Sequence, residues 1–175
     1  MFFELIRKRR SIRKFTPVPV ERAKVDLLIE TALRAPSSRG LNPWRFIVID
    51  QPDILEKLSH AKPHGGAFLR GAPLGIAVIG DPQKSDAWVE DCSIASILIQ
   101  LAAEALGLGS CWIQIRNREH NATISSEAYV REVLSIPDTL NVECLIALGY
   151  GDEIKAPHPA HTLEMEKVHM NRYER

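Results

Sequence analysis

The chain has 175 residues, of which 45% are apolar and 25% charged, the proportions of one globular domain that buries a core of its own. Its 22 basic and 22 acidic residues cancel, which argues against a general binder of nucleic acids. No apolar run reaches the ~20 residues of a membrane span, and three widely spaced cysteines show no zinc-binding pattern, so we expect a cytoplasmic protein without a metal.

The predicted elements mix helices and strands without a strict alternation. The spacing of apolar residues predicts helices over 2–10, 21–35, 53–60, 85–106 and 125–134. Short runs rich in β-branched residues predict strands over 44–50, 74–80, 110–115 and 140–151. This order indicates an α+β fold in which helices cover one sheet.

Three features of these elements bear on assembly. In the first helix we expect Phe2, Phe3, Leu5 and Ile6 on the buried side. The helix over 85–106 is apolar on nearly all sides, so it is expected to be buried, in part against a second subunit. Residues 152–175 form a polar tail without a core of its own, which we expect to dock on a partner.

A basic run near the start is the first candidate binding segment. Residues 7–14, RKRRSIRK, carry six basic side chains and no acid. Arginine forks bind phosphate with two hydrogen bonds, and the hydroxyl of Ser11 adds a neutral donor. From composition alone, a solvated basic surface is an equally good interpretation.

Two further segments could line a ligand. APSSRGLNPW, over 35–44, is a loop that can offer backbone groups to a flat heterocycle, although an ordinary polar connector has the same composition. GLGSCWIQ, over 107–114, joins the long helix to a strand, and its glycines permit close approach of the backbone. A helix end followed by a core tryptophan is the alternative interpretation.

Motifs of several other enzyme classes are missing from the sequence. It contains no GxGxxG after a first strand, no GxxxxGK[ST] and no GxSxG. His60 and His64 are four residues apart, but Pro63 interrupts any helix that would align them, and we expect no metal site.

Five segments together resemble the nitroreductase family of flavoproteins. They are RRSIRKF, APSSRGLNPWRFIVI, LIQLAAEALGLGSCWI, IPDTLNVECLIALGYGDE and EKVHMNRYER, which occur in the family's order over nearly the whole chain. The resemblance implies one FMN-binding domain over 1–175, with a mixed, mainly antiparallel sheet flanked by helices. It also implies an intertwined homodimer with two FMN sites at the interface and a tail, 152–175, that wraps the neighbour.

The resemblance also assigns roles to residues. Arg9, Arg10 and Ser11 are expected to hold the phosphate and ribityl chain of FMN, and Arg13 to lie near the pyrimidine edge of the ring. A second set of residues is expected to come from the loop of the partner subunit: Pro36, Ser37, Ser38 and Asn42. A third set, from GLGSCWIQ, is expected to line the other side of the ring, with a backbone amide near N5: Trp112, Ile113 and Gln114.

The implied function is an FMN-dependent NAD(P)H oxidoreductase that reduces nitroaromatics, quinones or similar small acceptors by hydride transfer through flavin N5. Because the flavin carries the chemistry, no catalytic residue is expected, and Arg13 would tune the ring by stabilising its reduced, anionic form. Dehalogenation, enoate reduction or flavin fragmentation on the same scaffold, or non-catalytic flavin binding, are the alternatives. One departure from the family stands out: PHPAHTLEME offers no Arg or Lys before Lys167, which predicts weaker phosphate binding.

Overall fold

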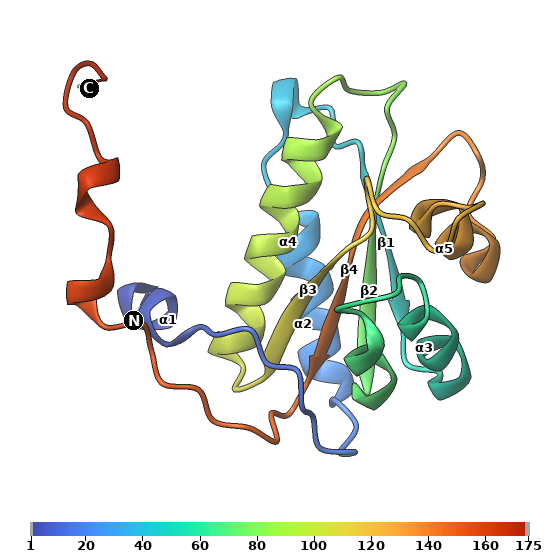
Figure 1. The fold of residues 1–175 in the computed structure, drawn as a ribbon, viewed down its shortest axis with the longest axis horizontal. Coiled ribbons are helices and arrows are strands. Elements are labelled where there is room, and N and C mark those ends of the chain that lie inside the picture. Colours follow the sequence, from blue (N-terminus) through green and yellow to red (C-terminus); the bar gives the residue numbers. More distant parts are fainter. Residues whose placement is uncertain (1, 174–175) are drawn as a thin grey trace.

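The computed structural model describes residues 2–173, and its elements follow the predicted order (Figure 1). The α-helices are α1 (Phe2–Lys8), α2 (Arg22–Leu33), α3 (Pro52–Ser59), α4 (Trp88–Ala105) and α5 (Ser126–Leu134). The strands are β1 (Trp44–Ile49), β2 (Leu74–Gly80), β3 (Gly109–Gln114) and β4 (Asn141–Gly149). Short 3-10 turns are η1 (Ser38–Gly40), η2 (Ala67–Gly71), η3 (Ala160–Thr162) and η4 (Met165–Lys167).

The four strands form one sheet in the order β1-β2-β4-β3. Every neighbouring pair is antiparallel, so the sheet is antiparallel throughout rather than mixed. A bulge in the β2–β4 pairing shifts the register between Val78 and Ile79. β2 and β4 lie in the middle and are almost wholly buried, whereas β1 and β3 are the edges of the sheet.

Helices cover both faces of the sheet (Figure 1). On one face α2 and α4 pack through buried residues such as Leu28 and Ile99 against Ile146 of β4. On the other face α3 and α5 contribute Leu55 and Val130 to a second cluster with Leu145. Consecutive strand residues point to opposite faces, which is why neighbours in β4 belong to different clusters.

Local sequence signals explain where α4 ends and where α5 begins. Gly107 has a φ of +74°, a left-handed conformation that closes α4 at little steric cost for glycine. At the start of α5 the Ser125 hydroxyl accepts a hydrogen bond from the N–H of Ala128 at 3.1 Å. Within residues 2–173 no helix combines the length and apolarity that a membrane span needs.

The expected burial of α1 is wrong for a single chain. Phe2, Phe3 and Ile6 are 57%, 73% and 50% exposed, and α1 contains no buried residue. The reason is position: α1 lies beside the C-terminal segment, away from the sheet, and leaves its apolar side chains uncovered (Figure 1). The tail runs outward next to it through η3 and η4, and its last two residues, 174–175, lie outside the described part.

Candidate functional site

An N-terminal arm, residues 9–15, runs from α1 to the edge strand β3. The arm meets the strand at a parallel bridge between Ser11 and Ser110, where the N–H of Ile12 donates to the Ser110 carbonyl at 3.0 Å. Gly109 makes this approach feasible, since a Cβ placed there would lie 2.9 Å from the Cβ of Ile12. The bridge and the missing side chain fix the arm against the sheet.

A cation from the chain segment after β4 reaches the arm at the same place. The Nζ of Lys155 donates to the Ser11 carbonyl at 2.7 Å and lies 3.2 Å from Oε1 of Glu153. The same carboxylate oxygen accepts the backbone N–H of Arg13 at 2.6 Å. This hydrogen bond, and then the Lys155 ammonium, hold the pKa of Glu153 below its ordinary value. The arm is therefore clamped between β3 and residues 153–155.

The sequence did not indicate Lys155, because this residue precedes PHPAHTLEME, the tail segment in which the family resemblance places a basic residue. The signal that could have found it is the position of Lys155 six residues beyond the end of β4, on the strand that pairs with β3. The structure brings Lys155 to Ser11, one residue from Arg10, so a basic side chain from the segment after β4 does reach the arm.

Basic side chains gather around the bridge. Arg9 and Arg10 are half-buried, and within residues 2–173 neither has an acidic partner at ion-pair distance. The pKa of the buried Cys111 thiol reflects these nearby charges. Burial raises its pKa, while the Arg13 guanidinium, a hydrogen bond from Ser11 and more distant cations oppose that rise. Uncompensated cations beside a hydroxyl are the donor set that a phosphate group requires.

Beyond Ser110 the outer edge of β3 is open. In an antiparallel edge strand, alternate residues turn their backbone groups away from the sheet. The backbone carbonyl of Ser110 points away from the sheet toward the arm, so the backbone groups of Trp112 and Gln114 also point away from the sheet. Within residues 2–173 no other strand lies beside them. Their side chains form a hydrogen-bonded chain, in which Trp112 Nε1 donates to Gln114 Oε1 at 2.9 Å and Gln114 Nε2 donates to the Arg116 carbonyl at 2.9 Å.

Ile113 is placed differently from its two neighbours. Its side chain is 1% exposed and belongs to the cluster beneath α3 and α5. The backbone groups of Ile113 alternate with those of Trp112 and Gln114 and point toward β4, so the open edge offers the N–H and C=O groups of its two neighbours, not of Ile113, to a flat heterocycle.

The loop with the second predicted set of residues is held in a fixed shape. The N–H of Ser38 donates to Oδ1 of the buried Asp91 at 2.7 Å. The Ser37 hydroxyl donates to Asn42 Oδ1 at 2.6 Å and accepts the Asn42 N–H at 2.8 Å. Arg39, which pairs with Asp86, and Asn42 both adopt positive φ. Pro36 and Asn42 are exposed at the surface of this loop.

The structure brings together the first and third predicted sets but not the second. The arm lies at the C-terminal end of α4, whereas Asp91 anchors the loop at the first turn of that helix. The helix rises about 21 Å between these two levels, at 1.5 Å for each residue. The loop also precedes β1, which is the opposite edge of the sheet from β3. Within one chain the loop cannot face the arm.

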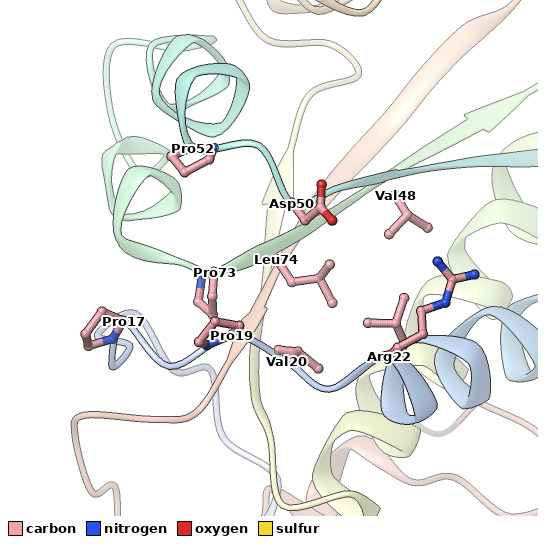
Figure 2. A pocket seen from close by; sticks show the side chains of 10 residues that line it. Pro17, Pro19, Val20, Arg22, Val48, Asp50, Pro52, Pro73 and Leu74 are labelled. Atoms are coloured by element: carbon pink, nitrogen blue, oxygen red, sulfur yellow. The ribbon is translucent and has the colours of Figure 1, made fainter.

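A separate cavity of about 390 Å³ lies at the end of β1 (Figure 2). Prolines 17, 19, 52 and 73 form much of its wall, and Arg22 and Asp50 also line it. None of the predicted site residues lines this cavity. Within residues 2–173 no group of three His, Cys, Asp or Glu side chains is arranged to hold a metal ion.

Known proteins share this fold. The family model described as the nitroreductase family matches residues 6–63 and 59–150. An FMN-dependent nitroreductase structure from Clostridium difficile R20291 is 48% identical, with a TM-score of 0.96 over 98% of this chain and 99% of that one. Relatives from Archaeoglobus fulgidus and Methanothermobacter thermautotrophicus, provisionally named NADH dehydrogenase/NAD(P)H nitroreductase, are 35% and 34% identical. They match 87% and 97% of this chain and each 86% of the relative. This chain belongs to the nitroreductase family.

Proposed function

We propose that this chain is an FMN-dependent NAD(P)H oxidoreductase that reduces nitroaromatics, quinones or similar small acceptors. The observation that carries the proposal is the meeting of Arg9, Arg10, Ser11 and Lys155 beside the open edge of β3. Relatives named for FMN and for NAD(P)H support the choice of cofactor and reductant.

The donor set fits the phosphate end of FMN. Two guanidiniums without acidic partners in the described chain, an ammonium and a hydroxyl supply charge and hydrogen bonds for a dianion. Their positions are set before any ligand binds, because the arm is fastened to Ser110 and to Glu153. A pre-arranged site loses little conformational entropy when the phosphate enters.

The flavin ring of FMN would bind beside Arg13 and the open edge of β3. Arg13 follows the bridge by two residues, and its guanidinium carries a full positive charge beside the place where reduction would add negative charge. Backbone N–H groups of the outward-facing strand residues, Trp112 and Gln114, are positioned to donate to ring nitrogen and oxygen atoms. A chain that orients the ring and stabilises charge needs no acid–base pair of its own.

The loop at residues 36–42 completes the site of a second copy. One FMN cannot touch both the arm and the loop of one chain, because α4 separates them. A homodimer in which each chain lends Pro36, Ser37, Ser38 and Asn42 to its neighbour resolves this separation. The tail, residues 152–175, would then wrap the neighbouring chain. The three cysteines are unpaired and buried, which suits the reducing cytoplasm.

The overall reaction balances as Ar–NO₂ + NAD(P)H + H⁺ → Ar–NO + NAD(P)⁺ + H₂O, in which the nitro group gains the two electrons that the nicotinamide loses. FMN, when bound, supplies the hydride-accepting N5 and passes both electrons onward. The chain contributes phosphate anchoring, ring orientation and the positive charge of Arg13.

The decisive experiment is the absorption spectrum of the purified protein with and without NADH or NADPH. We expect flavin absorbance that either nucleotide bleaches without oxygen and that a nitroaromatic or a quinone restores. A colourless protein that does not bind added FMN would refute the proposal. Bound flavin that stays oxidised under excess nucleotide would point to a non-catalytic binder, and an acceptor panel would identify another flavin reaction.

Two variants separate the phosphate end from the ring end. Arg9→Ala should weaken FMN binding by roughly 1.5–3 kcal/mol, the range of a hydrogen bond between charged groups. Arg13→Ala should lower the flavin midpoint potential more than it lowers affinity, since its charge acts on the reduced ring. Unchanged flavin content in the Arg9 variant would mean that the phosphate is held elsewhere.

A further inference from the structure

A shallow, open cavity lined by cations lies next to the proposed ring site. It has a volume of about 420 Å³ and lies between the arm and η2. Arg13, Lys14 and Arg70 contribute charged side chains, and Phe15 and Phe68 contribute rings. The remaining lining residues are Ala67, Gly71 and Asp152.

The positive charges of this cavity lack acidic partners in the described chain. Within residues 2–173 neither Arg13, Lys14 nor Arg70 forms an ion pair, and Asp152 is the one carboxylate in the lining. Asp152 binds the arm through its backbone N–H, which donates to the Lys14 carbonyl at 2.8 Å. Three cations against one acid leave a net positive cavity on a chain whose total charge is zero.

An aromatic surface accompanies the charge. The Arg13 guanidinium lies 5.7 Å from the centre of the Phe68 ring, within the range of a cation–π contact. This contact holds Arg13 at the boundary between the proposed ring site and the cavity. The other two cations of the lining are Lys14 and Arg70, and neither is assigned a role in binding FMN. Both side chains line the same cavity as Phe68.

We infer that the preferred acceptors are aromatic molecules that carry an acidic group, which Arg70 and Lys14 receive while the aromatic ring lies near Phe68. This inference rests on the proposed function, because it names the class of acceptor for that site. Arginine suits a carboxylate through two parallel hydrogen bonds, and lysine adds a point charge. The phosphate of a nicotinamide nucleotide is the other anion that could enter, so the test must separate the two sources.

The test compares two acceptors that differ in charge but little in size, 4-nitrobenzoate and 4-nitrobenzyl alcohol, with the FMN-loaded protein. Arg70→Met should lower kcat/KM for the benzoate by about fivefold, the upper end for an exposed charge pair, and leave the alcohol within about twofold. Arg70→Glu should lower the benzoate value further. Rising salt should reduce turnover of the benzoate alone.

Lys57→Met is the control, because it removes one exposed positive charge from α3, outside the cavity lining. Equal losses for both acceptors in Arg70→Met would overturn the inference, as would no loss for either. A raised KM for NADPH with unchanged acceptor values would overturn it by assigning the cavity to the nucleotide. Benzoate, which is not reduced, gives the same comparison with benzyl alcohol by calorimetry. The preference for an acidic acceptor can therefore be refuted while NAD(P)H still reduces the flavin. The same preference can be measured by calorimetry even if the protein reduces neither acceptor.

Discussion

At the level of single residues, Lys155 shows how one side chain can serve two purposes. Its ammonium binds the Ser11 carbonyl and Glu153, so it fastens the arm, and it adds positive charge beside the proposed phosphate site. The sequence pattern predicted the arm and its arginines as a binding segment. It did not reveal Lys155, because a contact between residues 144 positions apart depends on the pairing of β3 with β4.

Lys155→Met should weaken FMN binding by roughly 1 kcal/mol. This lies below the range for a buried charged hydrogen bond, because a quarter of the side chain stays exposed and water screens its charge. Titration of the FMN-free protein by flavin fluorescence measures the change, with Lys57→Met as the control. An affinity equal to that of the control would show that Lys155 serves the fold alone.

Glu143 is a buried acid that the proposed chemistry does not use. It is 4% exposed, and its Oε2 has no hydrogen-bond partner in the described chain. Burial raises its pKa above the ordinary value, with Glu127 and Glu90 adding to the rise and Arg116 opposing it. The thiols of Cys92 and Cys144 also lie within electrostatic range.

A raised folded-state pKa means that the folded protein holds this proton more tightly than the unfolded chain. The resulting stability is present below the unfolded pKa and is lost as pH rises through the folded value. Glu143→Gln removes the titration, so its melting temperature should match wild type below about pH 4, where Glu143 is protonated in both states, and exceed it near pH 8. We expect a difference of about 1 kcal/mol, or a few degrees, by calorimetry. A gap that narrows with rising pH would contradict this reasoning.

At the level of elements, the sequence patterns predicted the type and order of every α-helix and strand over residues 2–151, but not the 3-10 turns η1 and η2. The core explains this success, because both faces of the sheet are covered and the helices α2, α3, α4 and α5 each bury an apolar stripe. The same reasoning misplaced the apolar side chains of α1, which face no core in one chain. An apolar pattern indicates that something covers it but does not say which chain supplies the cover.

The arm and β3 depend on Gly109 for their close contact. Gly109→Ala introduces a Cβ that would lie 2.9 Å from Ile12, whose branched carbon cannot move without the arm. We expect roughly 1–3 kcal/mol of lost stability, as for an overpacked core, and FMN affinity about tenfold weaker by fluorescence titration. Gly71→Ala is the matched control, since a Cβ there meets nothing within 4 Å.

A second substitution can test the cause. If Ile12 is the obstacle, Gly109→Ala combined with Ile12→Ala should recover much of the lost affinity. A double variant no better than the single one would show that the alanine disturbs the backbone of β3 itself.

At the level of the whole molecule, most of the exposed large apolar side chains of the described residues lie in three segments. They lie on α1, on the outer side of α4 and in the tail: Phe2, Phe3, Ile6, Ile94, Ile97, Leu163, Met165, Val168, Met170 and Tyr173. Exposed apolar surface on this scale is typical of protein–protein interfaces, which agrees with the proposed homodimer. The tail extends away from the sheet beside α1, where it is free to reach a neighbour (Figure 1).

The proposed homodimer makes a prediction about which chain completes which site. We consider Arg9→Ala, which damages the arm, and a loop variant, Ser37→Ala with Asn42→Gly, in which glycine keeps the positive φ of residue 42. If each loop serves the neighbouring chain, a heterodimer of the two variants has one site with both defects and one site with none. If each loop served its own chain, both sites would carry one defect.

Differently tagged chains, co-expressed and purified through both tags, isolate this heterodimer. We expect it to bind about half of the FMN of wild type, and to bind it with wild-type affinity, while each variant homodimer binds weakly. A wild-type dimer carrying both tags supplies the reference. Weak binding at both sites of the heterodimer would mean that the arm and the loop of the same chain form one site, and it would overturn the proposed exchange. The separation of Ser11 and Ser38 along α4 argues against that outcome. Flavin stoichiometry in this heterodimer therefore measures the exchange of loops directly, independent of the acceptor that the enzyme reduces.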